Sequence, residues 1–417
     1  MNRKKVSRKK KRRIQRMRRL LILACVLLVL LNITALAGVI IYKVMDQSTQ
    51  ASITVAGDVM LHSPMLRSTY YYNSETNAYD FSSIFKYIEE DYKKADYTVC
   101  TFEGALGGGD YIGFENFISP PAIMSNLKNS GIDLCLLASN HLYDGYDEGL
   151  HATMDFMDQI KFNYLGIRQS TDIKPYKVQN IEGIKVGMVD YVYEAGNYKT
   201  INWKDVSDAS DPLISSFNYN TLDQFYAEAK NRYEAMKNDG AEVCMIYLHW
   251  GTEYSLTQSS TQESMAQALC DIGYNLIIGS HPHVIQPVDV LTSTDGSHQT
   301  FVAYAIGNHL SNQRYEYLSS EANGETEDGM MVNIKLSKDF HGNVEISDIS
   351  FTYTWVYMQT TDDNNQYYIL PLDDLEALND LPNLGTDPQD SINRTNKILG
   401  DSINKVKNAL PIAVPEN

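Results

Sequence analysis

Short hydrophobic runs alternate with amphipathic stretches along most of the chain between residues 53 and 306. The runs are rich in Val, Ile and Leu, and they predict buried strands at 53–56, 97–102, 132–138, 184–192, 242–248, 274–279 and 300–306. Apolar residues at helical spacing predict helices at 81–94, 121–130, 145–159, 221–237 and 260–272. Strands and helices that alternate in this way, at spacings of about 30–40 residues, are typical of a layered α/β domain.

Three later or intervening segments have other patterns. Residues 193–220 are polar and predict a long loop over the face where the strands end. Residues 329–372 alternate polar with β-branched and aromatic positions, which predicts a small antiparallel β addition packed on the main domain. Residues 373–417 form an acidic tail in which we predict one helix at 390–410.

The N-terminus has the pattern of a membrane anchor. Residues 1–19 carry twelve Lys or Arg and no acid, and residues 20–42 are uncharged and mostly apolar. A helix of about 20 apolar residues crosses a bilayer, and a basic flank stays in the cytoplasm. We therefore predict a single-pass protein of the cell membrane with an extracellular C-terminal domain. The small residues at 35–37 also fit a cleavable signal peptide, but the apolar run continues to Tyr42 and favours an uncleaved anchor.

Charge and cysteine content narrow the class further. Subtracting the thirteen positive charges of residues 1–43 from the net charge of −17 leaves −30 for the remaining 374 residues. Such an acidic domain repels polyanions, which argues against nucleic acid as the main partner, although the acidity also fits simple solvation of the surface. The five cysteines show no C-x-x-C spacing, so we favour buried free thiols over disulfides or a zinc knuckle. A domain of about 320 residues buries a large core without such staples.

Polar residues that bind metals follow five of the predicted strands. In open α/β sheets, ligands bind beyond the carboxyl ends of the strands, so we expect these residues to form one cluster. Carboxylate, amide and imidazole groups in such a cluster suit two divalent metal ions, with Mn, Fe and Zn not distinguished. The predicted metal ligands are Asp58, Glu103, Asn140, His249, His281 and His283.

His141 and Asp144 are the predicted catalytic residues. Asp144 is placed to accept a ring N–H from His141 and to fix its tautomer. The other ring nitrogen is then available for proton transfer or for contact with an oxyanion. Taken singly, each residue also fits a turn, a helix cap or a surface position. His62 fits a loop histidine as well as a ligand, and Glu253 fits a surface acid better than a ligand.

Six segments carry a resemblance to a known family. GDVML, FEG, SNHLYDG, HWGTEY, GSHPHVIQ and YAIGN resemble, in this order, the motifs of the CapA capsule-synthesis proteins over residues 52–312. That family includes the membrane-anchored component of poly-γ-glutamate synthesis, and its fold resembles the calcineurin-like metallophosphoesterases. The resemblance implies a four-layer αββα sandwich with a dinuclear metal centre bridged by Glu103. It also implies two kinds of partner, an anionic envelope polymer and other capsule-synthesis membrane proteins.

The chain departs from these patterns at three positions. His62 lies four residues after Asp58, whereas phosphoesterases have Asp-x-His, and Glu103 replaces the usual bridging Asp. His309 stands where the capsule family usually has Phe. The favoured function is synthesis, export or anchoring of an anionic capsular polymer. A metal-dependent phosphoesterase or hydrolase of the cell envelope, and a non-catalytic assembly factor with a vestigial site, are the alternatives.

Overall fold

The computed structural model describes residues 2–45, 48–107, 109–196, 199–318, 323–361, 364–379 and 381–415. The chain divides into two compact units, one of residues 1–49 with 339–342 and one of residues 50–338 with 343–417. The first contains the long helix α1 (Asn2–Met45). Its segment Arg8–Gly38 has the length and composition of a membrane-spanning helix, and a signal sequence near the N-terminus fits the same description.

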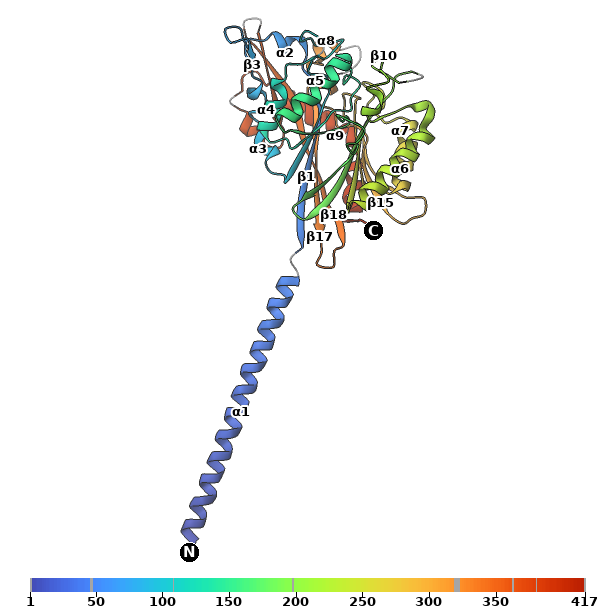
Figure 1. Cartoon of the computed structure of the whole chain (residues 1–417). Helices are drawn as coiled ribbons and strands as arrows, with labels where there is room; N and C mark the ends of the chain where they lie inside the picture. Colours follow the sequence, from blue (N-terminus) through green and yellow to red (C-terminus); the bar gives the residue numbers. More distant parts are fainter. Residues whose placement is uncertain are drawn as a thin grey trace. The chain divides into compact units, whose positions relative to one another are not determined.

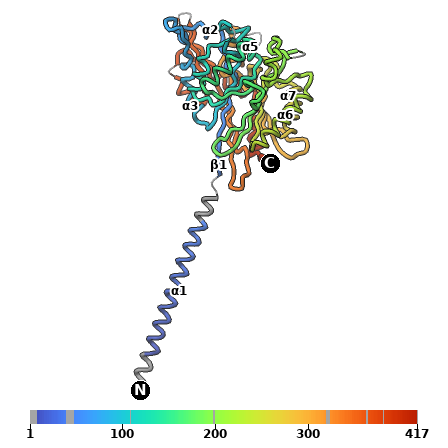
Figure 2. The backbone as a smooth tube through the Cα atoms, in the orientation of Figure 1, coloured from blue at the N-terminus to red at the C-terminus, as the bar shows by residue number. Residues whose placement is uncertain are grey.

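Two mixed β-sheets form the centre of the second unit (Figure 1). The strands of the first sheet are β1 (Thr49–Val59), β4 (Tyr97–Phe102), β5 (Leu134–Leu136), β6 (Asn163–Leu165), β16 (Asn308–Leu310), β17 (Asp328–Lys338), β18 (Val344–Thr361), β19 (Asn364–Pro371) and β20 (Ile412–Ala413). Their order is β19-β18-β17-β1-β4-β5-β6, with β16 beside β1 and β20 beside β18. Strand β1 therefore lies between β4, from the first quarter of the chain, and β17, from the last quarter. Figure 2 shows the blue start of this unit beside its orange C-terminal part.

The second sheet has the order β11-β8-β12-β13-β15-β14, with β7 beside β8. Its strands are β7 (Lys177–Ile181), β8 (Ile184–Tyr193), β11 (Ser216–Phe217), β12 (Val243–His249), β13 (Leu276–Ser280), β14 (Val288–Thr292) and β15 (Gln299–Ala303). Strands β8, β12, β13 and β15 are parallel, so their carboxyl ends lie at one edge of the sheet. The strands predicted from the apolar runs are all present.

Helices cover the outer face of each sheet. The longer ones are α4 (Ala122–Ser130), α5 (Tyr146–Gln159), α6 (Leu222–Asn238) and α7 (Ser260–Ile272). Alternate residues of the strands explain the layers, because side chains at successive strand positions point to opposite faces. Val55 and Val99 pack between the two sheets, whereas Ala56 and Cys100 pack under α4 and α5. A third cluster lies under α6 and α7, which gives the predicted four-layer αββα sandwich.

One predicted helix is broken. Residues 81–94 contain a 3₁₀ turn, η1 (Ser82–Phe85), followed by the four-residue helix α3 (Glu89–Tyr92). The apolar positions Ile84, Phe85 and Ile88 are buried as their spacing predicts. Periodicity therefore identifies the buried side chains here but not a continuous helix. The five cysteines are free, in agreement with the prediction from their spacing.

The C-terminal part of the chain, from β17 onward, belongs to the same fold. The antiparallel strands predicted in 329–372 are β17, β18 and β19, and they continue the first sheet directly beside β1. The predicted helix 390–410 is two helices, α9 (Asp387–Leu399) and α10 (Ser402–Ala409), separated at Gly400, which has φ +46°. Buried residues of this tail pack between the two sheets; they are Leu399, Val406 and Ile412.

The predicted long loop 193–220 contains a small hairpin, β9 (Thr200–Ile201) and β10 (Lys204–Asp205), and the edge strand β11. Residues 197–198 lie outside the described part of the chain. Ile214 forms a β-bridge with Ile167, and Ser215 N–H donates to Gly166 O at 2.8 Å. These contacts join the edges of the two sheets, so the segment both closes one side of the sandwich and reaches the edge where the strands end.

Candidate metal centre

Glu103 lies at the point where the carboxyl ends of strands from both sheets meet. It follows β4 directly and is fully buried. Its Oε1 lies 3.8 Å from His141 Nε2, 3.9 Å from His249 Nε2 and 3.8 Å from His283 Nε2. Three imidazoles from distant parts of the sequence therefore surround one carboxylate.

Asp58 projects from the end of β1, next to a close approach between two strands. The register of β1 against β4 shifts between Ala56 and Asp58. A Cβ at the intervening Gly57 would lie 2.0 Å from Gly307 O, so only glycine fits there. Asp58 Oδ2 accepts a hydrogen bond of 3.2 Å from the backbone N–H of His281. The bend thus directs the Asp58 carboxylate toward the segment that follows β13.

Two overlapping sets of ligand atoms share Glu103. One consists of Asp58, Glu103 and His283, and the other of Glu103, His249 and His281; within each set the candidate ligand atoms lie within 4.8 Å of one another. This is the arrangement that two metal ions bridged by one carboxylate need. Asn140 Oδ1 lies 2.7 Å from His249 Nε2, so the Asn140 amide is next to the second set.

Further contacts orient the imidazoles. His249 Nδ1 pairs with Ser280 Oγ at 2.9 Å, and His283 Nδ1 pairs with Asn308 Oδ1 at 3.1 Å. His281 and His283 have φ angles of +92° and +59°, which non-glycine residues rarely adopt. Backbone strain of this kind is concentrated at functional sites, where it fixes the direction of side chains.

His141 and Asp144 form a tight pair at the edge of the cluster. His141 Nδ1 lies 2.6 Å from Asp144 Oδ2, which also accepts the backbone N–H of Phe117 at 2.7 Å. Asp144 Oδ1 accepts from Asn202 Nδ2 at 2.9 Å and from Lys204 Nζ at 2.7 Å. Burial acts to raise the pKa of Asp144, but its bonds and charge interactions with His141, Lys204 and Asn202 hold it below the usual value. Asp144 is therefore a carboxylate that keeps the His141 proton on Nδ1.

Several buried polar atoms of the cluster make no hydrogen bond within the described part of the chain. Among the described residues, Asp58 Oδ1, both carboxylate oxygens of Glu103 and His281 Nδ1 have no hydrogen-bond partner. Burial raises the pKa of Asp58 to about 7 and that of Glu103 well above its usual value. Buried polar atoms are normally paired, so these unpaired oxygens and nitrogens are what a cation-binding site would offer. The donor set fits divalent metal ions.

The histidines are in the protonation state that metals bind. Burial lowers the pKa of His249 and His281 well below the usual value, and lowers that of His283 to about 3. A neutral imidazole has a lone pair to donate, whereas an imidazolium does not. The structure thus brings the six predicted ligands and the two predicted catalytic residues into one cluster. Their roles as metal ligands remain a prediction.

Some residues in or near the cluster lie in positions that the sequence analysis did not predict. His62 is buried, with both ring nitrogens unpartnered among the described residues, but it belongs to neither set of ligand atoms. Glu253, interpreted as a surface acid, is exposed, yet its carboxylate forms a third set with His281 and His283. Its position four residues after His249, just past the same strand end, was the available signal. Asn202 and Lys204 were missed because nothing in a polar loop sequence marks which of its residues fold back.

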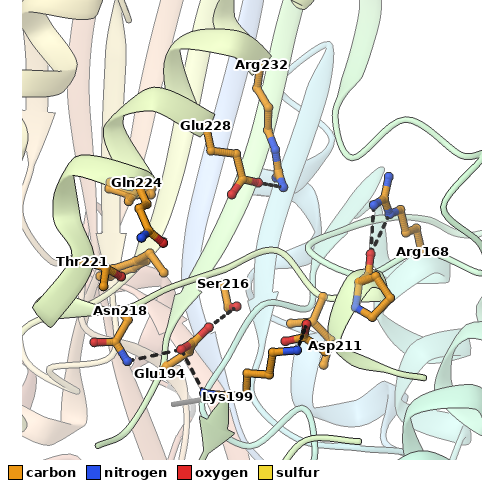
Figure 3. A pocket seen from close by; sticks show the side chains of 14 residues that line it. Arg168, Glu194, Lys199, Asp211, Ser216, Asn218, Thr221, Gln224, Glu228 and Arg232 are labelled. Carbon is orange, nitrogen blue, oxygen red and sulfur yellow. Dashed lines mark hydrogen bonds and ion pairs between the residues drawn. The ribbon is translucent and has the colours of Figure 1, made fainter. Parts of the chain in front are cut away.

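A separate pocket of about 450 Å³ is lined by Glu194, Lys199 and Asp211, among others (Figure 3). Glu194 accepts hydrogen bonds from Ser216 Oγ at 2.8 Å and from the Lys199 backbone N–H at 3.1 Å. Lys199 Nζ pairs with Asp211 at 2.7 Å. The lining contains three cations and three acids, so the charges of this pocket balance.

Comparisons with known proteins give a consistent family. The chain is 24% identical over 276 residues to the capsule biosynthesis protein CapA of Bacillus anthracis, covering 64% of this chain and 61% of that protein. It is 22% identical over 304 residues to the PGA biosynthesis protein CapA of Bacillus subtilis strain 168, covering 72% and 71%. The chain thus spans less than two thirds of the length of the first of these relatives.

A solved structure also matches, at a level from which we draw no conclusion. It is the Termus thermophilus sulfate thiohydrolase SoxB in complex with glycerol, with a TM-score of 0.32, 13% identity, and coverage of 72% of this chain and 42% of that one. The model of the family described as bacterial capsule synthesis protein PGA_cap matches residues 52–313, the segment that contains every predicted ligand. This chain belongs to the PGA_cap family of bacterial capsule synthesis proteins.

Proposed function

We propose that this protein acts in the synthesis, export or anchoring of an anionic capsular polymer, and that the polymer is poly-γ-glutamate. The family match over residues 52–313 carries the proposal. Two relatives support it, because one is named for capsule biosynthesis and the other for PGA biosynthesis. In this proposal α1 anchors the protein in the cell membrane with the C-terminal domain outside, where other capsule-synthesis membrane proteins are its partners.

The proposal includes two divalent metal ions held by the cluster. Asp58, Glu103 and His283 would hold one ion, and Glu103, His249, His281 and Asn140 would hold the other. Metal ions supply Lewis-acid polarisation of a phosphoryl or carbonyl oxygen. They also reconcile the −30 charge of the domain with a polyanionic partner, since cations can link two sets of carboxylates.

The chain's own proton-handling group is His141. Asp144 holds a proton on Nδ1 at 2.6 Å, which leaves the lone pair of His141 on Nε2. That nitrogen lies 3.8 Å from Glu103 Oε1, so it faces the centre of the cluster. A histidine held in this way accepts or returns a proton at a reacting oxygen. The pair supports a second candidate function, a metal-dependent phosphoesterase or hydrolase of the cell envelope.

Deletion and complementation test the proposal. We expect deletion of the gene in its own host to remove surface poly-γ-glutamate, measured by immunoassay on intact cells. The wild-type gene and the exposed-acid control Glu182→Gln should restore the polymer, whereas Glu103→Gln should not. An unchanged capsule after deletion would overturn the proposal. Combined with metal-dependent hydrolysis of bis-p-nitrophenyl phosphate by the purified chain, that result would favour the second function.

A further inference from the structure

The hairpin β9–β10 has an unusual residue at its turn. Its strands pair Ile201 with Lys204, so Asn202 and Trp203 are the two turn residues. Both have positive φ, +49° and +61°. Two-residue hairpins of this kind favour Asn-Gly, because glycine adopts positive φ without steric conflict. A tryptophan in the second position is therefore disfavoured, because its side chain makes positive φ sterically unfavourable.

Burial does not explain Trp203 either. Its side chain is 80% exposed, whereas the other two tryptophans, Trp250 and Trp355, are 0% and 3% exposed. A large aromatic side chain held in water contributes little apolar burial to folding. Folding stability alone therefore favours a small residue at this position, and strain combined with exposure indicates a function.

The residues on either side of Trp203 place it at the edge of the metal centre. Asn202 and Lys204 both donate to Oδ1 of Asp144, the partner of His141. Two other exposed aromatics are close in sequence to groups held at Asp144. Phe114 is 77% exposed and precedes Phe117, whose N–H donates to Asp144, and Tyr146 is 58% exposed and lies two residues after Asp144. Asp144 thus ties three segments with exposed aromatic residues to the rim of the cluster.

We infer that Trp203 is a ligand-contacting residue whose indole packs against the backbone of a linear acidic polyamide as the carboxylates of that polymer reach the metal centre. The inference rests on the proposed function. The methylene groups and amide planes of γ-linked glutamate offer flat, weakly polar surfaces that suit an aromatic face. An exposed tryptophan is also a residue type that contributes strongly to binding when it is covered.

Tryptophan fluorescence of the full chain in detergent, with Zn²⁺ added, tests the contact directly. Because Trp250 and Trp355 are buried, acrylamide should quench mainly Trp203. We expect poly-γ-glutamate of defined length to lower the Stern–Volmer constant at least about two-fold, as covered aromatic anchors lose solvent contact. Trp203→Phe should abolish this change. Binding of the polymer itself is measured in parallel by co-sedimentation.

Two variants separate binding from folding. Trp203→Gly should weaken polymer binding about ten-fold, as loss of a central aromatic anchor does, without lowering the midpoint of thermal unfolding. Glu182→Asn is the matched control. Glu182 is exposed at φ +46° in the equivalent turn between β7 and β8, about 30 Å along β8 from its carboxyl end. Both variants produce an Asn-Gly turn, but Glu182→Asn should leave binding unchanged.

The outcomes distinguish the inference from the proposed function. The inference is wrong and the proposed function stands if two results are found together. The wild-type chain and Trp203→Gly would bind the polymer equally, and acrylamide would quench Trp203 of the wild-type chain to the same extent with and without the polymer. If the wild-type chain does not bind the polymer, both are wrong. Protection of Trp203 by alginate, a carboxylated polysaccharide, but not by poly-γ-glutamate would overturn the polyamide assignment.

Discussion

Glu103 has both carboxylate oxygens inside the protein with three imidazole nitrogens within 3.9 Å. In the absence of a cation, such a group is a buried acid without a donor, and the folded state disfavours its ionisation. With a cation on each side, the same group is a bridging ligand. The surroundings of Glu103 therefore fit an ion-binding site better than a packed core.

The ligand assignment predicts which substitutions remove metal. Glu103→Gln and His281→Ala should each lower bound metal at least about ten-fold, because each leaves an ion short of a ligand. His141→Ala should keep the metal while abolishing function, since its place is beside the ions. The measurement is metal content of the purified full chain by mass spectrometry. His151→Ala, an exposed histidine on α5, is the control. Unchanged stoichiometric metal in both ligand variants would contradict the assignment.

A histidine away from the ligand sets predicts part of the acid sensitivity. His309 is buried, its Nε2 pairs with the Tyr92 hydroxyl, and burial lowers its pKa to about 3. In the unfolded chain the pKa of His is about 6.5. Between these values the unfolded state takes up a proton that the folded state does not, so stability is lost as pH falls below about 6.5.

The double variant Tyr92→Phe with His309→Phe should reduce this loss. Between pH 6.5 and 4.5, the free energy of unfolding of this variant should fall less steeply than that of the wild type, by about 1.4 kcal/mol per pH unit. Replacing both partners avoids an unpaired buried hydroxyl. Urea unfolding at several pH values measures the slope. His151→Ala should leave the slope unchanged, and an equal slope in the double variant would refute the assignment to His309.

At the scale of elements, the pattern of apolar residues was sufficient to predict a strand or helix whose own residues show the periodicity. Strands β1, β4 and β12 are mostly apolar, and Asp58, Glu103 and His249 at or just after their ends could be placed at a common edge from topology alone. The hairpin that brings Lys204 to Asp144 could not be predicted, because that contact depends on how a polar segment folds over a finished sandwich. The packing of the tail into the core could not be predicted for a related reason, because buried positions such as Val406 are few among its polar residues.

The helices α9 and α10 with β20 hold the two sheets together. Arg394 makes two hydrogen bonds of 2.7 Å to Asp328 of β17, and Lys405 pairs with Asp289 of β14. Strand β20 pairs with β18, while Ser402 Oγ accepts the Val288 N–H at 3.5 Å. The tail thus contacts the first sheet on one side and the second sheet on the other.

Ending the chain after Thr386 should therefore prevent stable folding. Removing Leu399, Val406 and Ile412 opens the core between the sheets. Losses of about 2–5 kcal/mol for each large buried side chain would together approach or exceed a typical stability of about 5–15 kcal/mol. Soluble yield and a cooperative thermal transition are the measurements. Ending the chain after Pro415 is the control, and it should fold normally. A soluble, cooperatively unfolding chain that ends at Thr386 would contradict this role.

At the scale of the whole molecule, the charge is divided between two regions. Residues 1–43 carry thirteen positive charges and the remainder carries a net charge of −30. A basic segment beside a membrane-spanning helix stays on the cytoplasmic side, where anionic lipids attract it. The acidic remainder has no such attraction. The division therefore supports an external domain with an internal basic tail.

Protease treatment of intact cells tests this topology. Proteinase K should digest the domain while an N-terminal epitope fused before residue 1 stays protected until the membrane is permeabilised. Both are followed by immunoblotting. The epitope should also remain with the membrane, because we expect α1 to stay uncleaved. Loss of the epitope from the mature protein, with an N-terminus near Gly38, would instead support a signal peptide. A domain protected in intact cells would reverse the orientation.

The position of Leu399, Val406 and Ile412 in the central core also orders events during synthesis. A nascent chain cannot close that core until residue 412 has been made and has left the ribosome. The last predicted ligand, His283, is made about 130 residues earlier, and the match to the family model also ends before the tail, at residue 313. Until then the tail cannot pack between the two sheets, so the core between them stays incomplete. A chain that ends before residue 412 therefore lacks part of this core, and we expect proteases to degrade it.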